Sequence, residues 1–184
     1  KYGVRSAIPM YKALELCPQA VVLPVDITCY KAVSKQVFAI FERLTPEIEK
    51  VSIDEAYLAV PANEGIEAAR SIRQAVRQEL NLPLSIGISK NKLLAKMACE
   101  MAKPDGLRTI LPDDVPAIIW PLPVTKLPGV GPKIEKLLRA RGILTISDLA
   151  ARPEEELVRL LGVGGRELYR FAHGWDNRPL ELER

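Results

Sequence analysis

The chain has 184 residues, of which 48% are hydrophobic, and carries a formal net charge of +3. This composition is that of a globular protein with one or two domains, and the small net charge identifies no partner by itself. No apolar run reaches the length of a membrane span, and the three scattered cysteines form no metal-type cluster, so we expect a cytoplasmic protein with reduced thiols and no membrane partner.

The first predicted elements are helical. Pro9 suits the start of a helix, Pro18 ends the pattern that follows, and residues 21–25 read as a short extended segment. Asp26 or Thr28 can cap a longer helix, which Pro46 follows. Its apolar positions recur with helical spacing and predict a core-facing stripe formed by Tyr30, Val33, Val37, Ile40, Phe41 and Leu44.

Two adjacent acids follow this helix. Neighbouring side chains in a straight strand point to opposite faces, so Asp54 and Glu55 could share a ligand only at a turn. Residues 49–53 and 56–60 can form the arms of a hairpin that has both acids at its tip. There the carboxylates could converge on a hard cation such as Mg2+. The alternative interpretation is a polar turn with solvated acids.

The next segment mixes helices and strands. A helix opens at Asn63 or Glu64, residues 84–88 alternate as a strand, and Ser89 can cap a helix that runs through Ala102. Residues 107–111 read as an edge strand, and Pro112 opens a polar stretch that predicts a domain boundary. This order predicts an α+β fold with a mixed or antiparallel sheet and helices on one face.

The remainder contains a repeated turn and no strand pattern. Gly-Val-Gly occurs at residues 129–131 and again at 162–164, each time before a predicted helix and a cation, Lys133 or Arg166. Two helices joined by such a turn resemble the helix-hairpin-helix module, whose backbone amides can face a phosphate. The alternative is an ordinary connection between helices.

Several of these segments, in this order, resemble motifs of Y-family translesion DNA polymerases. The segments that carry the resemblance are Tyr2-Gly3-Val4-Arg5 with Ile8-Pro9, Ser52-Ile53-Asp54-Glu55-Ala56-Tyr57-Leu58, Gly87-Ile88-Ser89-Lys90-Asn91-Lys92, Ala102-Lys103-Pro104-Asp105-Gly106 and Leu127-Pro128-Gly129-Val130-Gly131. One departure is Ala59, where many members carry Asp, but that position is not a metal ligand in the family.

The resemblance implies a function for named residues. Asp54 and Glu55 would be catalytic and would bind two Mg2+ ions, and Lys103 would pair with the incoming triphosphate. The partners implied are primer-template DNA and dNTPs, with a sliding clamp as a further partner through regions outside this sequence. The residues expected to contact DNA are Ser89, Lys90, Lys92, Gly129, Gly131, Lys133, Gly162, Gly164 and Arg166.

The resemblance also implies a domain order. Residues 1–25 would be a remnant of the fingers, 26–113 a ferredoxin-like palm, 114–175 an all-α thumb with tandem helix-hairpin-helix motifs, and 176–184 the start of a linker to an absent little-finger domain. The family's third metal-binding Asp would lie on a strand upstream of Lys1, so we expect the isolated chain to be inactive as a polymerase.

Two other functions remain open at this point. A non-catalytic DNA-binding or scaffold protein could derive from such a polymerase, although it would not need both acids at the turn. A nuclease built on the same module would require a further acidic cluster, which the sequence lacks. His173, the single histidine, lies in an apolar helix and is expected to be structural or surface-exposed and not catalytic.

Overall fold

The computed structural model describes residues 2–182. The chain divides into two compact units, Lys1–Val33 and Ser34–Arg184. In the first unit, helix α1 (Met10–Leu16) follows Pro9 as predicted, whereas residues 21–25 form no strand. Helix α2 (Ile27–Glu42) begins after Asp26, whose carboxylate accepts the Cys29 amide at 3.0 Å, so Asp26 and not Thr28 is the cap.

The strands form two separate two-stranded ladders. Strands β1 (Ile48–Lys50) and β2 (Ala56–Leu58) pair antiparallel, whereas β3 (Ile86–Ile88) and β4 (Leu107–Thr109) pair parallel. Antiparallel and parallel strand pairing, the two kinds that a mixed sheet contains, therefore both occur. Within residues 2–182, however, no hydrogen-bonded strand joins the two ladders into one sheet.

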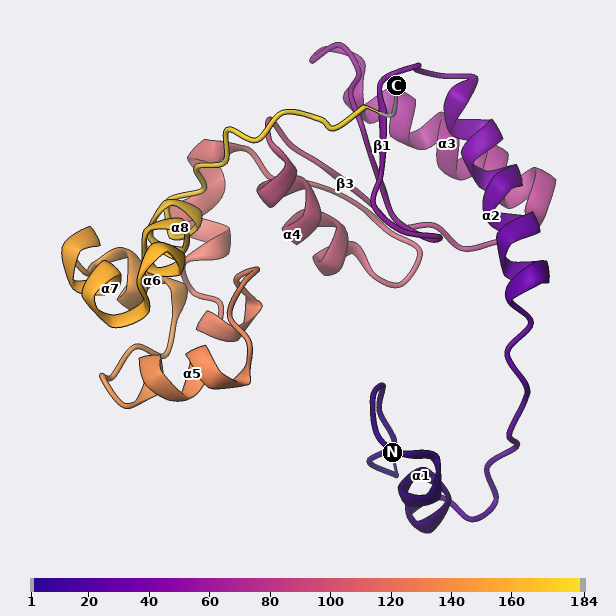
Figure 1. Ribbon diagram of the computed structural model, residues 1–184. Coiled ribbons are helices and arrows are strands. Elements are labelled where there is room, and N and C mark those ends of the chain that lie inside the picture. The colour runs from indigo at the N-terminus through magenta and orange to yellow at the C-terminus, as the bar shows by residue number, and fades with distance from the viewer. Residues whose placement is uncertain (1, 183–184) are drawn as a thin grey trace. The chain divides into compact units, whose positions relative to one another are not determined.

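A first core lies between the β1–β2 ladder and two helices, α2 and α3 (Gly65–Leu80) (Figure 1). The side chains of this core are Phe38, Ile40, Phe41, Ile48, Ile72 and Val76. The predicted stripe is wrong at two positions, because Tyr30 is exposed on α2 and Leu44 is exposed beyond the end of this helix at Glu42. Phe38, which the stripe omitted, is buried. The buried face of α2 includes Phe38 and Phe41, whose ring centroids lie 5.6 Å apart in an edge-to-face arrangement.

Helix α4 (Lys92–Ala102) packs directly on β3. The predicted cap at Ser89 is wrong, because the side chain of Asn91 accepts the Leu94 amide at 2.9 Å and starts the helix. Gly87 makes the close packing possible. A Cβ atom at this position would lie 1.9 Å from the carbonyl oxygen of Ala95, so the backbones could not approach with any other residue.

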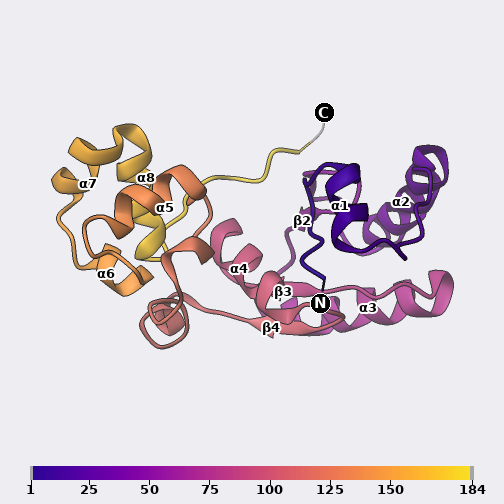
Figure 2. The same ribbon diagram turned by 90° about the horizontal axis from the view of Figure 1, so that it is seen from below.

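Beyond β4, the described chain is helical, as predicted, apart from one isolated bridge between Pro123 and Thr145. Figure 2 shows α5 to α8 gathered at one end of the second unit, beside α4. One continuous core joins α4 to these helices through Leu94, Leu138 and Leu168. The elements in order are η1 (Pro112–Asp114), η2 (Val115–Ile119), η3 (Val124–Lys126), α5 (Pro132–Arg139), α6 (Ile146–Ala150), α7 (Glu154–Leu161) and α8 (Val163–Ala172).

The segment after α8 passes the start of α4 and continues toward β1, as the yellow end of the chain in Figure 1 shows. Asn91 donates to the Gly174 carbonyl at 2.9 Å, and the buried carboxylate of Asp176 accepts the Leu93 amide at 2.9 Å. Arg178 also pairs with Asp176, at 2.7 Å. The bonds from Asn91 and Leu93 fix the segment to the start of α4, and the Arg178 pair holds Asp176 within the segment.

Candidate functional site

The acid pair lies at the tip of the β1–β2 hairpin. The amides of Val51 and Ser52 both donate to the Glu55 carbonyl, at 3.0 and 3.1 Å, and close the turn. The Ser52 hydroxyl donates to the Asp54 carboxylate at 2.6 Å, and Asp54 is exposed while Glu55 is half-buried. The predicted hairpin is confirmed with shorter paired arms, so the carboxylates project from a turn and not from a straight strand.

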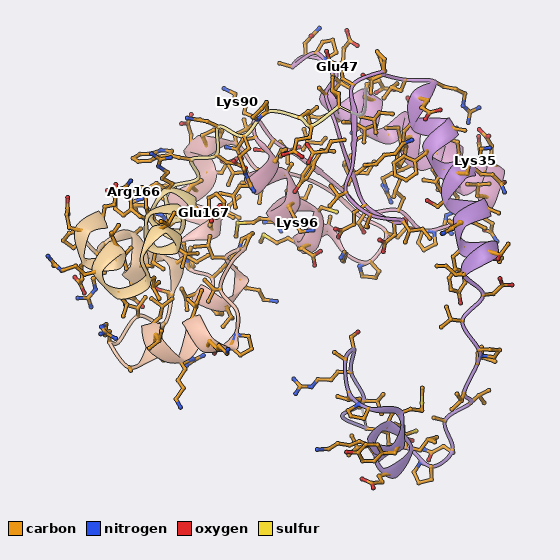
Figure 3. The ribbon with its side chains drawn as sticks, in the orientation of Figure 1. Lys35, Glu47, Lys90, Lys96, Arg166 and Glu167 are labelled. Atoms are coloured by element: carbon orange, nitrogen blue, oxygen red, sulfur yellow. The ribbon has the colours of Figure 1, made fainter. Side chains whose placement is uncertain are left out.

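Glu55 has a cation as its partner. The Lys96 ammonium of α4 lies 3.1 and 3.0 Å from the two carboxylate oxygens of Glu55. Burial alone would lower the pKa of Lys96, but the bond to Glu55 and its negative charge raise that pKa above its ordinary value. Figure 3 marks Lys96 on α4. The hairpin tip is therefore held to α4 by a charged pair.

The donor set fits a hard divalent cation in part. Asp54 and Glu55 supply carboxylate oxygens, which Mg2+ prefers, from consecutive positions of one turn. Among residues 2–182, no group of three or more His, Cys, Asp or Glu side chains is placed to hold a metal ion. Two carboxylates leave several positions of an octahedral ion for water, phosphate or further ligands.

Lys103 lies at the C-terminal cap of α4 with its side chain half exposed. Its ammonium donates to Glu100 at 2.5 Å, and this bond raises the pKa of Lys103 above its ordinary value. Lys103 is therefore a charged group at the C-terminal end of the helix that carries Lys96, and its partner Glu100 belongs to that helix.

Three residues expected to contact DNA, Ser89, Lys90 and Lys92, lie in the loop before α4 or at its first position. Ser89 donates its hydroxyl to the Ile110 carbonyl at 2.6 Å and thereby connects the ends of the parallel strands. Lys90 is exposed (Figure 3). Of these three predicted DNA contacts, only Lys90 directs its charge to solvent, because Lys92 is enclosed.

Lys92 sits in an internal polar cluster. Its ammonium donates to both oxygens of Glu49, at 2.9 and 2.7 Å, and to the Pro179 carbonyl at 3.0 Å, and the Lys92 side chain is only 12% exposed. Burial raises the pKa of Glu49, but the bonds from Lys92 and from the Glu181 amide outweigh it and lower that pKa below its ordinary value. Lys92 thus ties β1, α4 and the C-terminal segment together.

The repeated glycines occupy helix entrances. Gly129, at φ +91°, turns the chain before α5, and Gly131 caps that helix. Gly162, at φ +65°, caps α8, and Gly164 lies in its first turn with open space where a Cβ would be. The pattern missed Gly165, at which a Cβ would lie 2.0 Å from the Leu157 carbonyl oxygen of α7. The two adjacent glycines, Gly164 and Gly165, were the sequence signal that could have indicated this close packing of α7 and α8.

The cations after these turns differ in their surroundings. Arg166 pairs with Glu154 across the α7–α8 junction at 2.8 Å, and both side chains are substantially exposed. Lys133 is exposed in the first turn of α5, where neither its amide nor that of Ile134 has an acceptor within the helix. The start of α5 therefore combines backbone donors and a positive charge, which suits a phosphate.

Lys96 belongs to the basic stretch that also holds Lys90, Lys92, Lys103 and Arg108, but the sequence alone assigned it no role beside the acids. It lies four residues after Lys92 and seven before Lys103, so helical spacing could have placed it on the face that meets the hairpin. What the sequence could not show is that the tip of the hairpin folds against that face.

Comparisons with known proteins relate both parts of the chain to one family. Residues 1–100 match the impB/mucB/samB family, and residues 112–143, which include the first glycine turn and α5, match the helix-hairpin-helix motif of the same family. Among curated relatives, DNA polymerase IV of Xanthomonas campestris pv. campestris (strain 8004) is 49% identical over 98% of this chain. DNA polymerase IV of Pseudomonas paraeruginosa (strain DSM 24068 / PA7) is 44% identical over 99% of it.

Solved structures of DNA polymerases have the same fold. DinB from Sulfolobus solfataricus superimposes with a TM-score of 0.89 at 30% identity, over 98% of this chain and 55% of that one. An insertion ternary complex of Dbh DNA polymerase gives 0.87 at 30% identity, over 98% and 54%. The chain spans about half the length of the curated relatives, 52% of the Xanthomonas protein and 54% of the Pseudomonas protein. A family match over more than half of the chain, together with these relatives, shows that the chain belongs to the impB/mucB/samB family of Y-family DNA polymerases.

Proposed function

We propose that the full-length protein is a translesion DNA polymerase that extends a primer during damage bypass, and that this chain supplies its palm and thumb. The observation that carries the proposal is the pair of carboxylates, Asp54 and Glu55, at the hairpin tip of a chain that belongs to this family. In this assignment residues 26–113 are a ferredoxin-like palm, 114–175 the thumb, 1–25 part of the fingers and 176–184 a linker.

Asp54 and Glu55 would hold the divalent cations of the reaction. Two Mg2+ ions bound there would activate the primer 3′-oxygen and stabilise the leaving pyrophosphate. Glu55 lies beside the middle of α4 through its contact with Lys96. Lys103, at the end of that helix, would add a point charge for the incoming triphosphate. Phosphoryl transfer depends mainly on such positioning and charge neutralisation. A third carboxylate from outside this sequence would complete the site, so the isolated chain should extend primers poorly or not at all.

The rival function, a DNA-binding scaffold without catalysis, makes a different prediction. A primer-extension assay of the full-length protein with Mg2+, primed DNA and dNTPs distinguishes the two. The polymerase extends the primer, whereas a scaffold binds the duplex and leaves the primer unchanged. Binding without any extension by the full-length protein would favour the scaffold.

Lys103→Ala in the full-length protein is expected to weaken the productive use of dNTPs while duplex affinity stays nearly unchanged. Lys103 is half exposed and would leave Glu100 for the more strongly charged triphosphate, so its loss removes a contact to the nucleotide alone. Steady-state kinetics at varied dNTP, with duplex affinity measured in parallel, checks this. Unaltered dNTP kinetics would contradict the role of Lys103.

Lys133→Ala is expected to weaken duplex binding by a similar factor on any sequence. The amides and the ammonium at the start of α5 would bind phosphates, which are the same at every base step. Loss of one phosphate contact should flatten the slope of log affinity against log salt by up to about 0.9. Arg166→Ala should have a smaller effect, because Arg166 must first leave Glu154.

The control for Lys133 is Lys35→Ala, which removes the same charge from an exposed position on α2, outside the glycine turns (Figure 3). The measurement is a salt titration of duplex affinity on two unrelated sequences. Equal slopes of log affinity against log salt for wild type and Lys133→Ala, or a strong preference for one sequence, would contradict a phosphate contact at the start of α5.

A further inference from the structure

The ion pair between Lys96 and Glu55 places a positive charge at a carboxylate that the proposed function assigns to metal. The Lys96 ammonium is equidistant, within 0.1 Å, from the two oxygens of Glu55, at 3.1 and 3.0 Å. Both oxygens are therefore engaged by the protein's own cation. A divalent ion that binds Glu55 has to share or replace this partner.

The ion pair between Lys96 and Glu55 is partly open to solvent. The Lys96 side chain is 39% exposed and that of Glu55 is 41% exposed, so water and ions can reach the pair from one side. The pair is thus accessible enough to open without unfolding of the hairpin.

The contacts of the neighbouring lysines on α4 set Lys96 apart. Lys92 is nine-tenths enclosed against Glu49, and Lys103 pairs with Glu100 on its own helix. Lys96 alone among these three joins α4 to the tip that carries the acids. A long flexible stem lets its ammonium leave the carboxylate while the backbone of α4 stays in place.

We propose that Lys96 is the internal counter-ion of Glu55: it holds this carboxylate toward α4 before a metal binds, competes with divalent cations for it, and moves off when they bind. The inference rests on the proposed function, in which Glu55 is a metal ligand. Lys96 is in this view a positioning residue. Its positive charge lowers the affinity for divalent cations, and its bond to Glu55 keeps the empty site ordered.

The test measures cation binding directly. Mn2+, a hard cation that accepts the same oxygen ligands, reports its bound fraction by electron paramagnetic resonance. An exposed ion pair of this kind shifts an equilibrium by up to about fivefold. Lys96→Ala in the full-length protein should therefore bind Mn2+ about two- to fivefold more tightly than wild type, whereas Lys96→Arg, which keeps the charge, should bind like wild type.

Three further variants complete the experiment. Glu55→Gln should lose this binding, and Lys136→Ala, which removes one exposed charge from α5, should leave it unchanged. Lys96→Met retains the aliphatic stem and replaces the Ala variant if that protein does not fold. If Mn2+ binding depends on Glu55 but Lys96→Ala binds Mn2+ no more tightly than wild type, the counter-ion role of Lys96 is wrong and the polymerase assignment stands. Binding that does not depend on Glu55 at all would overturn both.

Discussion

Asp54→Ala or Glu55→Ala in the full-length protein is expected to reduce primer extension at least about a hundredfold. Each substitution removes a ligand that would neutralise charge in the transition state, and losses of this kind cost two to three orders of magnitude or more. Folding should change little, because both side chains lie at the accessible tip of the hairpin, whose closing bonds come from the backbone. Duplex affinity should also stay close to that of wild type.

The matched control for the acids is Asp113→Ala, which removes an exposed carboxylate from η1, away from the hairpin. This variant should extend primers at the wild-type rate. Circular dichroism and duplex binding establish that each variant is folded. Near-wild-type extension by either hairpin variant would refute the assignment of these acids to catalysis.

Gly165→Ala is expected to destabilise the protein by roughly 3 kcal/mol, because overpacking against rigid backbone is among the costlier single substitutions. Gly165 is buried in the first turn of α8, and a Cβ there would lie 2.0 Å from the Leu157 carbonyl oxygen and 2.9 Å from the Val158 nitrogen. Neither backbone atom can rotate away, so the two helices would have to separate.

The adjacent Gly164 provides the control. It lies in the same turn of α8, and a Cβ there would meet no atom within 4 Å. Gly164→Ala should leave stability unchanged or raise it by up to about 1 kcal/mol, since Ala loses less backbone entropy in a helix. Urea unfolding of the two variants and wild type makes the comparison. Equal midpoints for Gly164→Ala and Gly165→Ala would contradict the packing at the α7–α8 turn.

The sequence predicted features that depend on local patterns. The hairpin with Asp54 and Glu55 at its tip follows from two short apolar arms around an acidic turn. The helical region after β4 follows from its 3.6-residue periodicity, and its second turn occurs at Gly162 as the repeat indicated. In each case neighbours in the chain determine the outcome.

Features that depend on contacts between distant segments were not predictable. The enclosure of Lys92 requires Glu49 and Pro179, which are 43 and 87 residues away in sequence. The pairing of Lys96 with Glu55 likewise depends on how the hairpin meets α4. The cap at Asn91 replaces Ser89 because the Ser89 hydroxyl is already bonded to Ile110 on the neighbouring strand.

The most direct test of the central claim is single-turnover incorporation of one correct dNTP by the full-length protein as Mg2+ is raised. Wild type and Glu55→Gln are compared on the same primed DNA. We expect the wild-type rate to rise and saturate with Mg2+, and the variant to remain at least about a hundredfold slower at every concentration. A variant that stays within about threefold of wild type throughout the titration would contradict a catalytic metal site at the hairpin tip.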